Sequence, residues 1–375
     1  MDSEPLTATK KLKDDGISKM NSKLRPILAK ELTQLPLLEK SFIGVLKNKR
    51  NISKAITCLV KCLPCPQFLK RCADMKLYIA PIHSMDGSVE NLKKLLVEKN
   101  FDLSWLEDEF EIVEIPCEVP RTKDQMIYAQ KFWPVNFHPD LNLEAIISGS
   151  IFDEVQQESL EMCMKSLIQA AELSAVGTTE CNGSALIIDP DQGSILSIAA
   201  SSIDQHPMWH ASMLAVDLVA RLQGGGAWQL FKDDVSQIPS NGTMKRKCPG
   251  VTPLRYPEIL HKLRLPETGS LHPMNKNSKK SDKKLKQSED KSGPYLCTNY
   301  WAVLLQEPCP LCAMALLHSR VSRIFYGTSN PRTGILGSKA VLHSVPGLNH
   351  RYQVWSSLLE EECAQILQKC RVVDT

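Results

Sequence analysis

Apolar and polar positions alternate in two different ways through the first third of the chain. Runs with every second position apolar predict strands, and apolar residues at three- and four-residue spacing predict helices. The expected strands cover 42–46, 76–80 and 110–115, and the expected helices cover 53–63 and 89–97. This β-α-β-α-β order predicts a small α/β domain over residues 26–140, preceded by a mobile basic arm over residues 1–25.

The rest of the chain carries a longer alternation. Helices are expected at 153–174, from Pro207 to the three glycines at 224–226, from Cys309 to Ser319 and at 352–369; the second of these carries His210. Strands are expected at 185–189, 194–200, 300–305 and 321–327. This order predicts a mixed sheet with helices on both faces, a three-layer α/β/α domain over residues 150–375. Residues 227–294 have little periodicity, and 272–294 hold seven lysines against three acidic residues, so we expect a partly disordered insertion there.

Composition places limits on compartment and partners. Apolar content of 43% and charged content of 23% are typical of soluble globular proteins. The net charge of +3 is mild, so affinity for nucleic acid would have to come from local basic patches. No apolar run approaches the roughly 18 residues of a membrane span. Thirteen cysteines, an odd number, favour a reducing compartment, and we expect the cytoplasm, the nucleus or both.

Two short motifs carry candidate metal chemistry. His210 lies at the start of one expected helix, and Cys309 and Cys312 form a Cys-x-x-Cys at the start of another. Three such ligands suit a tetrahedral zinc ion whose fourth position is open. Zinc base deaminases combine H-x-E with P-C-x-x-C, and their glutamate transfers protons. Here Ser212 occupies the position of that glutamate. We therefore expect a zinc-holding fold with no catalytic residue of its own.

Further stretches extend these motifs into a family pattern. Residues 323–327, 333–334, 337–338 and 348–351 are similar in type and order to the stretches that follow the zinc motif in deaminases. Over roughly 150–370 the chain resembles the cytidine-deaminase-like superfamily, and within it the adenosine deaminases that act on transfer RNA. The serine, the extra N-terminal domain and the segment Phe132-Trp133-Pro134 are similar to the non-catalytic subunit of the eukaryotic heterodimeric wobble-adenosine deaminase. The resemblance implies a catalytic partner subunit, transfer RNA as ligand, and inosine as the product of the complex.

The fourth metal position and the function both leave alternatives open. Water could fill that position, or the chain's own end, Val373-Asp374-Thr375, could close it. An autonomous deaminase using Glu307 as an unusual base is one alternative function, and an RNA-binding scaffold without a deaminase partner is another. Glu307 is favoured instead to hold a nearby backbone or ligand loop. Asp217 is expected to face the surface or a partner.

Several residues between the two domains combine charge with aromatic surface. They are candidates for contact with RNA loops or phosphates: Arg121, Lys123, Lys131, Phe132 and Trp133. Burial of the two aromatic side chains at the domain junction is an equal alternative. A separate group of thiols, at Cys58, Cys62, Cys65 and Cys72, is favoured to pack in a core and not to hold a second metal.

Overall fold

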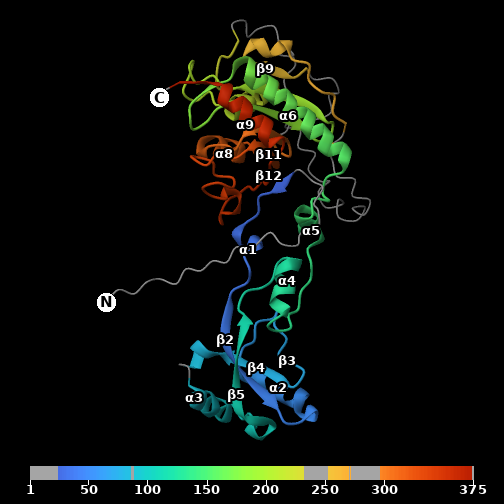
Figure 1. Cartoon of the computed structure of the whole chain (residues 1–375), viewed down its shortest axis with the longest axis vertical. Helices are drawn as coiled ribbons and strands as arrows, with labels where there is room; N and C mark the ends of the chain where they lie inside the picture. The colour runs from blue at the N-terminus through green and yellow to red at the C-terminus, as the bar shows by residue number, and fades with distance from the viewer. Residues whose placement is uncertain (1–23, 86–87, 232–251, 270, 272–295, 374–375) are drawn as a thin grey trace, which may run out of the picture. The chain divides into compact units, whose positions relative to one another are not determined.

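The computed structural model describes residues 24–85, 88–231, 252–269, 271 and 296–373 (Figure 1). The chain divides into two compact units. One unit contains Lys30–Ala145, and the other contains Ile146–Thr375 together with the segment 24–29. The basic arm predicted at 1–25 and the lysine-rich segment predicted at 272–294 lie outside the described residues, apart from residues 24 and 25.

The N-terminal unit contains a four-stranded antiparallel sheet. Its strand order is β3-β4-β2-β5, with β3 at Cys72–Ala73, β4 at Lys76–Pro81, β2 at Leu38–Leu46 and β5 at Leu106–Pro116. Its helices are α1 (Lys30–Thr33), α2 (Ile52–Cys62), α3 (Val89–Glu98) and α4 (Lys123–Gln130). The predicted alternation of strands and helices is therefore present, with the strands longer than the sequence pattern indicated.

Both faces of this sheet are covered. Phe42 and Ile43 are neighbours in β2 and belong to different core clusters, as expected for adjacent residues in a strand. Phe42 packs with residues of α2 and α3, whereas Ile43 packs with Ala129 of α4 and with Trp133. A capping box begins α4, where Thr122 and Gln125 exchange hydrogen bonds with each other's backbone.

The C-terminal unit is built on a seven-stranded mixed sheet. The strand order is β1-β12-β11-β10-β7-β8-β9. The strands are β1 (Arg25–Pro26), β7 (Ser184–Asp189), β8 (Ser194–Ala200), β9 (Leu254–Tyr256), β10 (Trp301–Gln306), β11 (Arg323–Thr328) and β12 (Gln353–Ser356). β10, β11 and β12 run parallel, and β7 is antiparallel to both β10 and β8. β1 extends the edge beyond β12, so the predicted domain start at residue 26 is wrong for this segment.

Helices cover both faces of the large sheet. One core cluster joins the sheet to α7 (Ala211–Leu222) and α8 (Pro310–His318), which also pack against each other. On the sheet's other side, α6 (Glu154–Ser174) contacts β10 and β7, and α9 (Glu360–Lys369) contacts β11. The predicted three-layer α/β/α arrangement with a mixed sheet is confirmed. In the described part of the chain, none of the helices combines the length and hydropathy needed to cross a bilayer.

The last predicted helix differs from the structure. The helix expected at 352–369 begins only at Glu360, because residues 353–356 form β12 and pair with β11. Ser357 and Leu359 have φ values of 67° and 53°, a left-handed backbone that separates the strand from the helix. Within the insertion predicted at 227–294, β9 joins the edge of the sheet beside β8, outside the lysine-rich part at 272–294.

Candidate metal centre

Two of the predicted ligands occupy equivalent places at the starts of packed helices. His210 is the N-cap residue of α7 and Cys309 is the N-cap residue of α8, both with extended backbone. Neither side chain makes the usual capping hydrogen bond to its own helix, so both are available to a ligand. Because helix N-termini carry partial positive charge, thiolates are favoured at this position.

The helix that carries His210 starts later than predicted. Residues 206–209 form a turn and not the first turn of α7. The backbone N–H of Met208 donates to Nδ1 of His206, and the His206 ring stacks on the Trp209 ring at 5.6 Å. Pro207 therefore lies in this turn, and the turn sets the direction in which His210 enters the site.

The three predicted ligands meet a fourth donor that the sequence pattern did not identify. Nδ1 of His210 lies 3.5 Å from Sγ of Cys309, 3.5 Å from Sγ of Cys312 and 3.1 Å from Sγ of Cys181. Sγ of Cys181 and Sγ of Cys312 are 3.9 Å apart. All four donor atoms lie within 4.8 Å of one another. Three sulfurs and one imidazole nitrogen form a donor set suited to a soft or borderline metal ion, so the residues present fit such a group.

The close approach of the thiols shifts their pKa values in different directions. The pKa of Cys309 is strongly lowered because Cys181 and Cys312 interact with its sulfur by hydrogen bonding, with a further contribution from His210. Hydrogen bonding with Cys309 raises the pKa of Cys181. Hydrogen bonding with Cys181 and Cys309 raises the pKa of Cys312. A cation bound among these sulfurs would favour their deprotonated forms.

Ser212 and Asp217 both lie on α7 and are both buried. Ser212 offers a hydroxyl and no carboxylate near this helix start. Asp217 accepts hydrogen bonds from Nε of Arg221, at 3.2 Å, and from the backbone N–H of Ala227. The expectation that Asp217 faces the surface is wrong, because its carboxylate is used to hold the loop that follows α7.

Glu307 holds a loop, as favoured from the sequence. Its side chain is 1% exposed, and its carboxylate accepts from the backbone N–H groups of Asn330, Leu336 and Ser338 at 2.9, 2.9 and 3.0 Å. The Ser338 hydroxyl donates a fourth bond. A Cβ at Gly334 would collide with this carboxylate, so the loop fits closely around it. A carboxylate engaged by four donors has little capacity left for proton transfer.

Comparison with known proteins places the chain in a family, although no protein-family model matches it. It is 29% identical over 345 residues to the "Probable inactive tRNA-specific adenosine deaminase-like protein 3" of Danio rerio, covering 92% of this chain and 88% of that relative. It is 23% identical over 288 residues to the "tRNA-specific adenosine deaminase subunit tad3" of Schizosaccharomyces pombe, covering 73% and 71%. The chain belongs to the family of these deaminase-like proteins.

A structural comparison gave a weaker match. A chain from "Biochemical and Structural Studies of A-to-I Editing by tRNA:A34 Deaminases at the Wobble Position of Transfer RNA" has a TM-score of 0.26 and 18% identity, covering 49% of this chain and 83% of that chain. The resemblance inferred from the sequence motifs is confirmed by the sequence relatives.

Of the five residues predicted to contact RNA, some are exposed in the structure and others are partly or fully buried. Arg121, Lys123 and Lys131 are exposed, and Phe132 is half-buried with its ring 5.2 Å from that of Tyr128. Trp133 is only 3% exposed, and its indole N–H donates to the backbone carbonyl of Lys70 at 2.7 Å. Trp133 is therefore a core residue and is not available to stack on a base.

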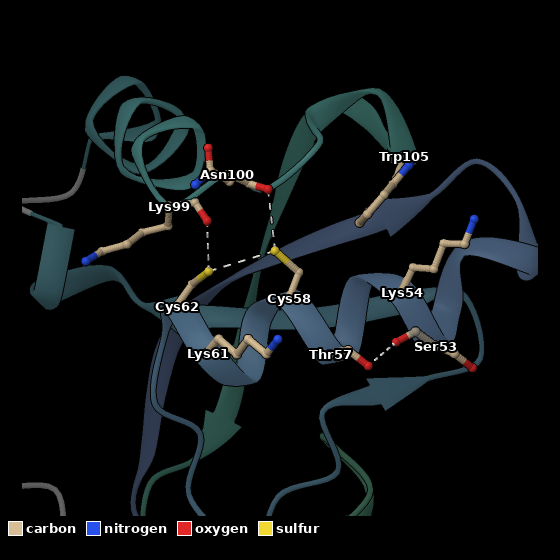
Figure 2. A pocket seen from close by; sticks show the side chains of 9 residues that line it. All are labelled: Ser53, Lys54, Thr57, Cys58, Lys61, Cys62, Lys99, Asn100 and Trp105. Atoms are coloured by element: carbon tan, nitrogen blue, oxygen red, sulfur yellow. Dashed lines mark hydrogen bonds between the residues drawn. The ribbon is translucent and has the colours of Figure 1, made fainter.

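A cationic pocket in the N-terminal unit was not predicted. It has a volume of about 610 Å³, and its lining includes Lys54, Lys61, Lys99 and Trp105. Figure 2 shows two thiols that point from α2 toward the pocket's far wall, Cys58 toward the carbonyl of Asn100 and Cys62 toward that of Lys99. Lys54 and Lys61 lie on α2, whereas Lys99 follows α3, and only the fold brings Lys99 to the same pocket.

The four thiols of the N-terminal unit do not form a second cluster with metal-binding spacing among the residues that the structure describes. Cys58 and Cys62 lie 3.9 Å apart, and each thiol of the four interacts with a backbone carbonyl. Cys58, Cys62 and Cys72 pack at the edge of one core cluster and Cys65 at the edge of another. This agrees with the preference for core packing.

Proposed function

We propose that the chain is the non-catalytic, zinc-holding subunit of a heterodimeric transfer-RNA adenosine deaminase. The catalytic subunit would convert adenosine to inosine at the wobble position, and this chain would support it and help to bind the transfer RNA. One observation carries the proposal: Ser212 stands where a zinc deaminase has its proton-transferring glutamate. Loss of a positioned general base costs about 10²–10⁴-fold in rate.

The carboxylate beside the cysteine motif offers no substitute base. Glu307 is fully committed to the backbone of the 330–338 loop. The printed names of two relatives, one an inactive deaminase-like protein and one a deaminase subunit, support the same assignment.

The proposal assigns the metal a structural role. His210, Cys309 and Cys312 would hold zinc between the starts of α7 and α8. When bound, zinc would supply folding free energy, which is roughly 10–16 kcal/mol for structural sites in small peptides. α7 and α8 pack against each other, and this packing brings the two ligand-bearing helix starts together.

Two surfaces of the N-terminal unit support a role in binding transfer RNA. Arg121, Lys123 and Lys131 are exposed around α4. The pocket lined by Lys54, Lys61 and Lys99 adds three lysines beside an aromatic side chain. Lysines neutralise backbone phosphates, and folded RNA is recognised largely through such contacts.

Reconstitution tests the proposal directly. The chain is purified alone and together with a catalytic deaminase subunit, and inosine in transfer RNA is quantified by mass spectrometry of nucleosides. We expect no inosine with this chain alone and inosine with the complex. Turnover by the chain alone would refute the proposal in favour of an autonomous deaminase. Recovery as a monomer that binds RNA but does not bind a deaminase would favour the scaffold alternative.

A further inference from the structure

We propose that Cys181 supplies the fourth ligand of the metal, so that three thiolates and one imidazole close the site and no position is left for water. This inference rests on the metal-holding role in the proposed function and specifies its chemistry. Catalytic zinc sites have three protein ligands and an open position, whereas structural sites have four protein ligands.

Four of the six distances between the donor atoms lie close to those of a tetrahedron. With metal–sulfur and metal–nitrogen bonds of about 2.3 and 2.0 Å, a tetrahedral site separates two sulfurs by about 3.8 Å and a sulfur from the nitrogen by about 3.5 Å. Sγ of Cys181 lies 3.9 Å from Sγ of Cys312, and Nδ1 of His210 lies 3.1 to 3.5 Å from the three sulfurs. Cys181 therefore lies close to the ligand–ligand distance of a tetrahedral site from both His210 and Cys312.

A defined turn delivers Cys181 to this vertex. The turn follows β6 (Val176–Gly177) and precedes β7. Oγ1 of Thr178 accepts from the backbone N–H groups of Glu180 and Cys181 at 3.2 and 3.1 Å. The backbone N–H of Thr178 donates to the carbonyl of Cys181 at 3.0 Å. A threonine that binds the backbone of its own turn restricts the directions open to the cysteine.

The loop around Glu307 fixes this turn from one side. Nδ2 of Asn330 donates to the carbonyl of Glu180 at 2.7 Å, and Oγ1 of Thr333 donates to the same carbonyl at 2.8 Å. The carboxylate of Glu307 in turn holds the backbone N–H of Asn330. Glu307 precedes Cys309 by two residues, and Glu180 precedes Cys181 directly. One network thus couples the two ligand-bearing segments, and Glu307 is a positioning residue.

The end of the chain fixes the turn from another side. β13 (Arg371–Val372) runs parallel to β6, and the backbone N–H of Val373 donates to the carbonyl of Gly177 at 2.9 Å. Nδ2 of Asn182 donates to the carbonyl of Arg371 at 3.1 Å. The described part of the tail therefore acts through its backbone. The expectation that a tail carboxylate closes the site falls on Asp374 and Thr375, which lie outside the described residues.

X-ray absorption at the zinc edge of the purified full-length chain tests the inference without an activity assay. We expect one zinc per chain with three sulfur scatterers and one nitrogen. Cys181→Ser should reduce the sulfur count from three to two. It should weaken zinc binding in a chelator competition by more than about 100-fold, because loss of even an outer-shell partner costs about 10–100-fold. Cys117→Ser, another half-buried thiol with no part in the cluster, should change neither value.

Asn330→Ala separates positioning from ligation. It should weaken zinc binding by about 10–100-fold while the sulfur count stays at three, since Cys181 remains present but less well held. Two sulfurs and an oxygen in the unmodified chain would overturn the inference and leave the proposed function intact. A chain that folds and forms an active complex without zinc would overturn the inference and the metal-holding part of the proposed function together.

Discussion

Sγ of Cys181 lies 3.1 Å from Nδ1 of His210, although the two residues are 29 positions apart and the β7–β8 hairpin separates them. All four donors of the cluster come from one polypeptide and from one compact unit. Formation of the metal centre therefore does not require a residue from another chain, and its properties are measurable on this subunit alone.

Metal removal should destabilise the isolated chain strongly. Loss of a metal centre is among the few changes that cost more than about 4 kcal/mol, which corresponds to a fall in Tm of roughly 8 °C or more for a unit of this size. Thermal unfolding followed by circular dichroism, with and without a strong chelator, measures this. Cys312→Ala should show the low Tm already without chelator and no further fall with it. An unchanged Tm after complete loss of zinc would contradict a structural role.

Substitutions at Ser212 should have little effect on the complex. Ser212→Ala removes only a hydroxyl, so inosine formation by the heterodimer should remain within about twofold of the unmodified complex. Ser212→Glu restores the missing carboxylate, yet the isolated chain should remain inactive because Cys181 leaves no position for water. Both are assayed by nucleoside mass spectrometry. Inosine formed by the isolated Ser212→Glu chain would show that the fourth position is open.

Glu307→Gln should destabilise the C-terminal unit by about 3 kcal/mol. Hydrogen bonds to a charged group contribute about 1.5–3 kcal/mol, and the NH₂ group of the new glutamine would face N–H and O–H donors of the loop without being able to accept from them. Urea unfolding measures this change. Glu361→Gln, at an exposed site on α9, is the control and should change stability by less than about 0.5 kcal/mol. A stable Glu307→Gln variant that abolishes inosine formation in the complex would instead support a catalytic role for this residue.

The sequence predicted the metal ligands that lie in short local motifs and missed the ligand that does not. His210, Cys309 and Cys312 lie in short motifs at helix starts, and the structure brings them together. Cys181 stands alone in a polar turn, 128 positions before Cys309, and only the folded hairpin brings it to the other donors. In the N-terminal pocket, Lys99 likewise lies far in sequence from Lys54 and Lys61, which share α2. Sequence patterns identify ligands on one element more readily than ligands that converge from several.

The errors in the fold have a similar cause. Trp355 and Leu358 continue the three- and four-residue spacing of α9, so the pattern predicted one long helix. The structure instead stacks the Trp355 ring on that of Phe325 at 5.1 Å across neighbouring parallel strands. A contact between residues 30 positions apart outweighed the local periodicity. The burial of Asp217 was not predicted because the backbone N–H that its carboxylate accepts from, at Ala227, lies beyond the end of the helix.

Trp133 should contribute to stability and not to RNA binding. Trp133→Ala removes a buried indole and should destabilise the N-terminal unit by about 3–5 kcal/mol. Trp133→Phe keeps the ring and loses the hydrogen bond to the Lys70 carbonyl, at a cost of about 1 kcal/mol. Urea unfolding measures stability, and transfer-RNA binding is measured where both variants are folded. A loss of RNA affinity with unchanged stability would indicate that the indole stacks on a base after all.

The cationic pocket should contribute to RNA affinity through charge. Replacing Lys54, Lys61 and Lys99 with alanine should weaken transfer-RNA binding by the complex and reduce the slope of log affinity against log salt by about one for each lysine that contacts a phosphate. Fluorescence anisotropy at several salt concentrations measures the slope. The matched control replaces three exposed lysines of the other unit, Lys165, Lys262 and Lys339, and should leave the slope nearly unchanged. Equal losses from the two sets would mean that binding reflects net charge and that the pocket has no particular part in it.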